Sequence, residues 1–249
     1  MKHLILLLGL GLNVAAAAHA AQNQQSPNPI EVPAEIERIF IPQGFDDNDN
    51  VEVVLHGNFP NTCYQVGNAE AKVDAASRTV TVSATSLKYP GTFCIQSITP
   101  FIQTVKLGII PEGDYQVIYS KDQQVRSSLQ VTRRKTESPD DYLYATVENA
   151  YIDVNSESGK QALKMQGHFP FFFIGCMVLK DVRVLKSPTD VLVVQPIAEI
   201  VEDEAVCASQ PEDRAFEYTS GLAEPFKGEG LLHVRTLHGN SLNRYINIQ

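Results

Sequence analysis

Apolar and polar residues alternate through most of the chain, which is the pattern of half-buried β-strands. Val80, Val82 and Ala84 alternate with threonine and serine, and residues 115–119 repeat the alternation. Glycine, proline, asparagine and aspartate fall between such runs, and no long segment has an apolar period of 3.6. The pattern predicts an all-β chain that folds as a sandwich or barrel.

The N-terminus has the order of residues found in secretory signal peptides. Lys2 precedes an apolar run over residues 4–18, and Ala18-His19-Ala20 follows as a cleavage site. The run is too short and too weakly apolar for a stable membrane span. We expect residues 1–20 to be removed, residues 21–34 to be a disordered N-terminal segment, and the product to be periplasmic or secreted.

Two stretches of the chain resemble one another. The interval from Cys63 to Cys94 equals that from Cys176 to Cys207, which selects one of the three possible pairings of four cysteines and predicts two disulfides. A Gly-x-Phe-Pro sequence precedes the first cysteine of each pair, and other strand patterns recur in the same order. The matching segments are residues 36–41 and 147–152, 53–60 and 163–170, and 113–117 and 230–234.

Such ordered self-similarity indicates a duplication, and therefore two modules. We expect a first β-sandwich domain at residues 35–132, a polar linker at residues 133–142 and a second β-sandwich domain at residues 143–249. The third matching pair places Leu232 of the second copy at the position of Tyr115.

Residues 107–117 contain a leucine, a turn glycine and Tyr115 ahead of an alternating strand. This segment resembles the tyrosine corner of immunoglobulin-like and fibronectin type III sandwiches. The resemblance implies two tandem immunoglobulin-like β-sandwich domains, each with one internal disulfide. It implies no function, because such sandwiches carry many unrelated activities.

Composition and motifs argue against several classes of function. The formal net charge is −9, and the only basic cluster lies at residues 133–135, so we expect no nucleic-acid partner. The chain contains no H-E-x-x-H, C-x-x-C, G-x-S-x-G or glycine-rich phosphate loop. We therefore expect no enzymatic activity, no cofactor and no catalytic residue.

An acidic segment at residues 46–50 has the alternating oxygen side chains that open a calcium loop. Asp46, Asn48 and Asn50 are thus a weak metal-site candidate, but Val51 and Gly57 stand where an EF-hand needs its glycine and its glutamate. An ordinary solvated loop is the preferred interpretation.

Aromatic residues crowd the segment that precedes Cys176. Strand packing accounts for alternate members of such a run, and exposure of the others would mark a partner site. The candidate partner-binding residues are Phe169, Phe171, Phe172 and Phe173.

These patterns favour a non-catalytic exported protein that serves as a binding or structural module of a bacterial envelope or of the secreted fraction. Its partner would be a protein or a cell-surface component. A two-domain periplasmic chaperone and a hydrolase with a dispersed active site are the alternatives.

Overall fold

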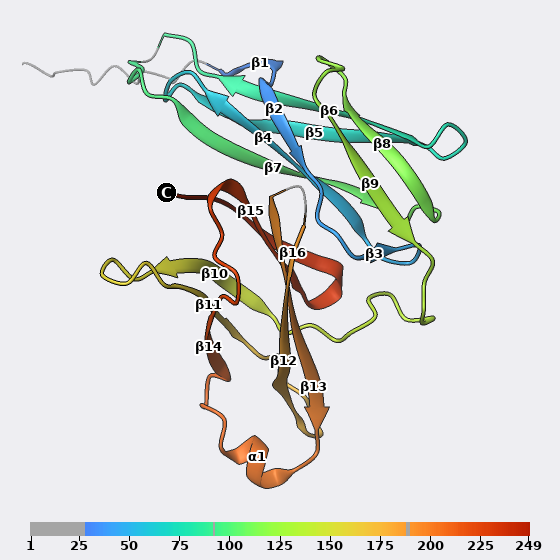
Figure 1. The fold of residues 1–249 in the computed structure, drawn as a ribbon, viewed down its shortest axis with the longest axis vertical. Coiled ribbons are helices and arrows are strands. Elements are labelled where there is room, and N and C mark those ends of the chain that lie inside the picture. The colour runs from blue at the N-terminus through green and yellow to red at the C-terminus, as the bar shows by residue number, and fades with distance from the viewer. Residues whose placement is uncertain (1–27, 92, 188–189) are drawn as a thin grey trace, which may run out of the picture.

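A computed structural model describes residues 28–91, 93–187 and 190–249, and these residues form an all-β protein (Figure 1). The strands of its first half are β1 (Ile30–Pro33), β2 (Ile36–Phe40), β3 (Phe45–Asp46), β4 (Val51–Phe59), β5 (Tyr64–Asp74), β6 (Thr79–Lys88), β7 (Thr99–Gly108), β8 (Gly113–Tyr119) and β9 (Arg126–Thr132). The elements of its second half are β10 (Val147–Val154), β11 (Gln161–His168), β12 (Cys176–Lys186), β13 (Val191–Val201), α1 (Glu204–Ala208), β14 (Ala215–Gly221), β15 (Gly228–Thr236), the short 3-10 helix η1 (Leu237–Gly239) and β16 (Asn240–Ile248).

Each half places a three-stranded sheet against a larger one. In the first half the order β2-β4-β7 faces β1-β6-β8-β9-β3, with β5 also paired to β6. In the second half β10-β11-β14 faces β12-β13-β15-β16. A large apolar cluster of side chains fills the space between the sheets of each half. The protein therefore contains a β-sandwich in its first half and a second pair of facing sheets in its second.

The strand pairings of the first half recur in the second. The parallel pair β6–β8 has its counterpart in the parallel pair β13–β15, and each is flanked by antiparallel neighbours in the same order. Even the irregularities match, because the ladder shifts register after Ile36 in β2 and after Val147 in β10. The self-similarity in the sequence thus corresponds to a repeated strand order.

Gly57 of β4 and Gly167 of β11 explain why the Gly-x-Phe-Pro sequence occurs twice. A Cβ atom at Gly57 would overlap the carbonyl oxygen of Glu35, and one at Gly167 would overlap that of Thr146. Only glycine permits the first strand of each half to approach this closely.

The phenylalanine two positions after each of these glycines is buried. Phe59 stacks on Phe101 with ring centroids 4.1 Å apart, and Phe169 stacks on Phe216 at 4.5 Å. The repeated sequence thus encodes a close strand contact with an aromatic pair beside it.

The expected equivalence of Tyr115 and Leu232 is wrong by two residues. The ladders pair Gly113 with Val131 and Gly228 with Ile248, so the counterpart of Tyr115 is Gly230. A Cβ atom at Gly230 would overlap the ring of Phe226. The second half therefore fills the tyrosine's place with an aromatic ring from the preceding turn.

The expected disorder of residues 21–34 is wrong for its last part, because β1 occupies residues 30–33 and pairs antiparallel with β6. Ala34 follows as a fully buried residue whose N–H donates to the carbonyl of Ala84. The expected signal peptide and the start of the expected disordered segment lie outside the described residues.

The two halves share an apolar interface. In Figure 1 the strands β2, β4 and β7 lie on the side of the first half that faces β15 and β16. Phe40 and Val54 project from that sheet and pack with residues of β13 and β15, namely Val191, Val193 and Leu231. Both β4 and β13 are consequently buried on both faces over most of their length, which explains why their apolar residues do not strictly alternate with polar ones.

Two disulfides join Cys63 to Cys94 and Cys176 to Cys207, the pairing expected from the sequence. The first links the start of the β5–β6 hairpin to the loop that follows it. The second links the start of the β12–β13 hairpin to α1. Disulfides of this kind suggest a non-reducing environment.

Candidate functional site

The aromatic segment between β11 and β12 divides into buried and exposed residues. Phe169 is buried on Phe216, and Phe172 packs against a small apolar cluster that includes Met177 and Ala198. Phe171 is 63% exposed and Phe173 is 97% exposed. Two of the four candidate phenylalanines are therefore held by the core, and the other two are presented to solvent.

The two exposed rings are arranged against one another. Phe171 and Phe173 meet edge to face with centroids 5.5 Å apart. The guanidinium of Arg214 lies 5.4 Å from the centroid of Phe171, and its Nε donates to the carbonyl of Phe169 at 3.2 Å. With the exposed Ile174, these rings make an apolar patch, which we call the aromatic tip (Phe171, Phe173 and Ile174).

The base of the aromatic tip is fixed by the fold. Gly175 has a φ of 75°, and a Cβ atom there would overlap the carbonyl oxygen of Val201. Cys176 follows directly and is bonded to Cys207 in α1, whose N-terminus is capped by the carboxylate of Asp203. A close backbone contact, a disulfide and a capped turn thus anchor the exposed rings.

The corresponding end of the first half also exposes apolar side chains, which the sequence pattern did not lead us to expect. Phe93 is 93% exposed beside Cys94, and Ile95 and Ile98 are also exposed. The sequence did contain an indication of this exposure, because these apolar residues lie in a loop with proline and glycine and do not follow the alternation of a strand. Each disulfide-linked end therefore carries an aromatic ring in solvent.

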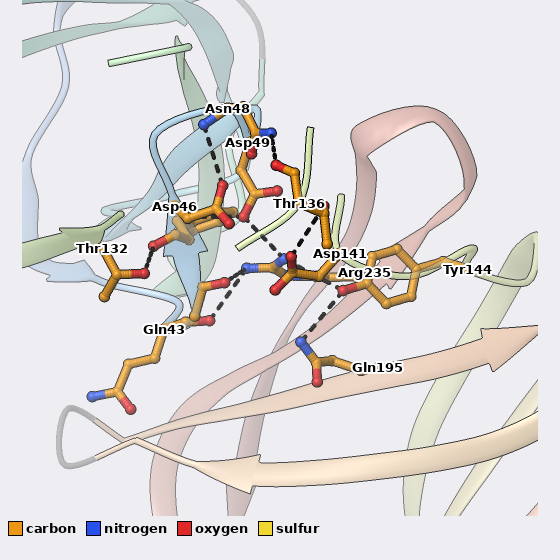
Figure 2. A network of polar contacts seen from close by, with 12 residues as sticks. Gln43, Asp46, Asn48, Asp49, Thr132, Thr136, Asp141, Tyr144, Gln195 and Arg235 are labelled. Carbon is orange, nitrogen blue, oxygen red and sulfur yellow. Dashed lines mark hydrogen bonds and ion pairs between the residues drawn. The ribbon is translucent and has the colours of Figure 1, made fainter. Parts of the chain in front are cut away.

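Three residues of the acidic segment, Asp46, Asn48 and Asp49, belong to a buried polar network between the halves (Figure 2). The Asp46 carboxylate accepts from the backbone N–H of Asn48 at 3.2 Å. The side-chain amide of Asn48 donates to the carbonyls of Thr136 and Ser138, each at 3.1 Å. The Asn48 side chain is thus hydrogen-bonded to the backbone of the linker.

The side-chain amide of Asn50, the third metal-site candidate, lies against Gly239, next to a groove at the linker. Within residues 28–91, 93–187 and 190–249, no three His, Cys, Asp or Glu side chains form a group that could hold a metal ion.

Arg235 of β15 is the centre of the network. Its guanidinium donates to the Asp49 carboxylate at 3.3 Å and to the carbonyl of Gly44 at 2.5 Å. It also lies 4.5 Å from the centroid of Phe45 and 3.5 Å from the hydroxyl of Tyr144. The sequence pattern does not single out Arg235, because an arginine in a strand is typical of an exposed position.

A groove of about 560 Å³ opens beside this network and is lined by linker residues and by η1. Burial, and then the neighbouring carboxylate of Asp49, raise the pKa of Asp140, which lines the groove. Burial likewise raises the pKa of the Tyr144 hydroxyl, although Arg235 opposes the shift. The groove therefore places partly desolvated carboxyl and phenol groups side by side on its lining.

A second buried contact crosses the interface at His233 of β15. Its Nδ1 lies 2.8 Å from Oδ1 of Asn243 and 3.5 Å from Oε1 of Glu52. Burial lowers the pKa of His233 to about 4, against the opposing effect of the Glu52 carboxylate. The imidazole is therefore neutral at pH 7 and donates from Nδ1, so its contact with Glu52 is not an ion pair.

Residues 53–131, about a third of the chain, match the family described as the ORF11 beta-sandwich domain. No curated protein and no solved structure matches the chain. The matched segment runs from β4 to β9 and includes the first disulfide. The match and the strand pairings both show a β-sandwich in the first half.

Among the described residues, no helix is long and apolar enough to cross a membrane.

Proposed function

We propose that this is a non-catalytic exported protein whose two tandem immunoglobulin-like sandwiches bind another protein through the aromatic tip. The observation that carries this proposal is the exposure of Phe171 and Phe173 beside the buried Phe169. Exposed aromatic rings on a rigid base lose little conformational entropy when they bind, and aromatic residues are frequent binding hot spots.

The immunoglobulin-like part of the proposal is supported by the corner at Tyr115. Its hydroxyl donates to the carbonyl of Pro111 at 2.9 Å, which is a bond back to the backbone just upstream. The repeated strand order supports the proposed modules at residues 35–132 and 143–249, with residues 133–142 as the linker. The disulfides and the N-terminal sequence pattern support export to the periplasm or beyond.

The proposal is tested by placing a photocrosslinking phenylalanine analogue at Phe173 and, in a second variant, at Phe93. Phe93 is the matched control, because it is equally exposed beside the other disulfide. We expect a discrete crosslinked protein with the probe at Phe173, and its loss when Phe171 is also changed to serine. Equal crosslinking from both sites, or none from Phe173, would contradict a binding role for the aromatic tip.

The linker groove supports hydrolysis as a second candidate function. It is lined by Asp140, whose pKa is raised, and by the exposed His238 and the buried Tyr144. A raised carboxyl pKa near a histidine is a feature of acid–base sites. Turnover of ester or glycoside substrates that is abolished by Asp140→Asn would support this function, and no turnover by the intact protein would reject it.

A further inference from the structure

The two halves differ in how they cover one sheet edge. In the first half, β1 pairs with the end of β6, from Pro33 opposite Thr85 to Ile30 opposite Lys88. The next backbone bond of that ladder runs from the N–H of Ala34 to the carbonyl of Ala84. The end of β6 is therefore covered by a strand from the N-terminal part of the chain.

In the second half the same ladder begins but stops early. The N–H of Ala145 donates to the carbonyl of Pro196, which matches the bond between Ala34 and Ala84. Tyr144 then forms an isolated bridge with Ile197, in the place of Pro33 and Thr85.

One further bond, from the N–H of Ala198 to the carbonyl of Leu143, ends this ladder. Among the described residues, no strand or bridge continues it beyond Ala198.

The next position along β13 is therefore open on one side. Ile200 is the counterpart of Lys88, and its strand partner is Met177 of β12. Backbone groups in a strand alternate in direction, so the N–H and C=O of Ile200 point the same way as those of Ala198, away from β12. The Ile200 side chain is 48% exposed. This edge thus offers a free backbone donor, a free acceptor and an apolar side chain.

The aromatic tip lies at the same end of the sandwich. Met177, the partner of Ile200, belongs to the small apolar cluster that also contains Phe169 and contacts Phe172. Phe171 and Phe173 flank Phe172 directly in the chain. A segment lying along the end of β13 would therefore reach the exposed rings.

The sequence around this edge is strongly acidic. Glu199 is bonded to Lys180 at 2.5 Å, and Asp203 caps α1. Glu202 and Glu204 are exposed and form no salt bridge within the described part of the chain. An incoming segment would meet unneutralised carboxylates just beyond the open backbone positions.

We propose that the edge of β13 at residues 199–201 is a docking site for an extended segment of a partner protein, which pairs antiparallel with β13. The segment has alternating apolar residues, as β1 does on the equivalent edge, and basic residues that face Glu202 and Glu204. Its apolar side chains contact the aromatic tip. This inference deepens the proposed function and rests on it.

The test uses a phage-displayed library of short random peptides, panned against the full chain with both disulfides intact. We expect enrichment of peptides that alternate apolar residues and carry lysine or arginine. Ile200→Pro removes the free N–H and no intramolecular bond, and proline is tolerated at strand edges. It should weaken binding of the selected peptides by about tenfold or more, whereas Ile200→Ala, which keeps the N–H, should cost less.

Amide hydrogen exchange on the unsubstituted protein gives a second measurement that does not depend on a variant folding. The selected peptide should slow exchange of the Ile200 N–H, while the N–H of Lys88, whose edge is already covered by β1, should be unaffected. Failure to enrich any peptide, or unchanged exchange at Ile200, overturns strand docking.

The serine variants of Phe171 and Phe173 separate this inference from the proposed function. Peptides that depend on the two rings but tolerate Ile200→Pro would overturn strand docking and leave the aromatic tip as a binding site. Peptides that depend on Ile200 and ignore both rings would leave the edge as a docking site and reject the proposed role of the tip.

Discussion

Asp49 and Arg235 are 186 positions apart in the sequence, yet their side chains form a buried ion pair at 3.3 Å between the two halves of the molecule. Asp49 lies in the turn before β4, and Arg235 lies near the end of β15. Removing one member of such a pair leaves the other charged and desolvated. The pair therefore couples the stability of the two halves.

We expect Arg235→Leu to lower the free energy of unfolding by about 3–5 kcal/mol, because it leaves the Asp49 carboxylate buried without its cation. Arg183→Ala is the matched control, because Arg183 forms an exposed pair with Asp181, and its loss should cost much less than the loss of the buried pair. Urea denaturation of both variants measures the difference. Equal costs would show that the buried pair does not hold the halves together.

The neutral His233 makes stability depend on pH. Its folded-state pKa of about 4 lies below the ordinary value of 6.5, so between these values the unfolded chain binds a proton that the folded protein excludes. Above pH 6.5 the protonation of His233 does not lower the free energy of unfolding. As the pH falls from 6.5 toward 4, the free energy of unfolding decreases by roughly 3 kcal/mol.

His233→Gln keeps a donor for Asn243 and removes the titration. The difference between the two proteins in free energy of unfolding, measured from pH 7 to pH 4, should shrink toward the acidic end. A difference that stays constant with pH would show that His233 titrates normally in the folded protein.

Gly57 and Gly167 should be equally intolerant of substitution. Alanine at either position would push a Cβ atom into the carbonyl of the preceding strand, and relief requires that strand to move. We expect each change to cost about 1–3 kcal/mol or more.

Gly221→Ala is the control for these substitutions, because its nearest neighbour would be 4.0 Å away. Thermal unfolding compares the three variants. A tolerated alanine at Gly167 alone would mean that the two halves do not share this contact.

The sequence predicted the features that are local or that repeat. Alternation in β6 and β8 gave the buried faces, and equal cysteine spacing gave both disulfides. The sequence could not predict that the Phe226 ring takes the place of the Tyr115 ring in the second half. Phe226 comes from a turn, and only the strand register shows that Gly230 is the counterpart of Tyr115.

The interface between the halves was equally hidden from sequence reasoning. Val54 and Val193 face the other half and not their own core, so their strands lack the alternation that marks a solvated face. The contacts that bury Glu52 and Asp49 come from residues far along the chain. Such burial depends on how two sheets meet, which periodicity within one strand does not encode.

Substitutions in the aromatic segment should affect stability at its buried ring and leave stability nearly unchanged at its exposed rings. Phe169→Ala removes a buried ring stacked on Phe216, and we expect it to lower the free energy of unfolding by about 3–5 kcal/mol. Phe171→Ala and Phe173→Ala remove exposed rings and should each change it by less than about 0.5 kcal/mol. Chemical denaturation of the three variants provides the comparison. If Phe173→Ala destabilised the protein as much as Phe169→Ala, the exposed ring would have a packing role, and its presentation to a partner would lose its physical basis.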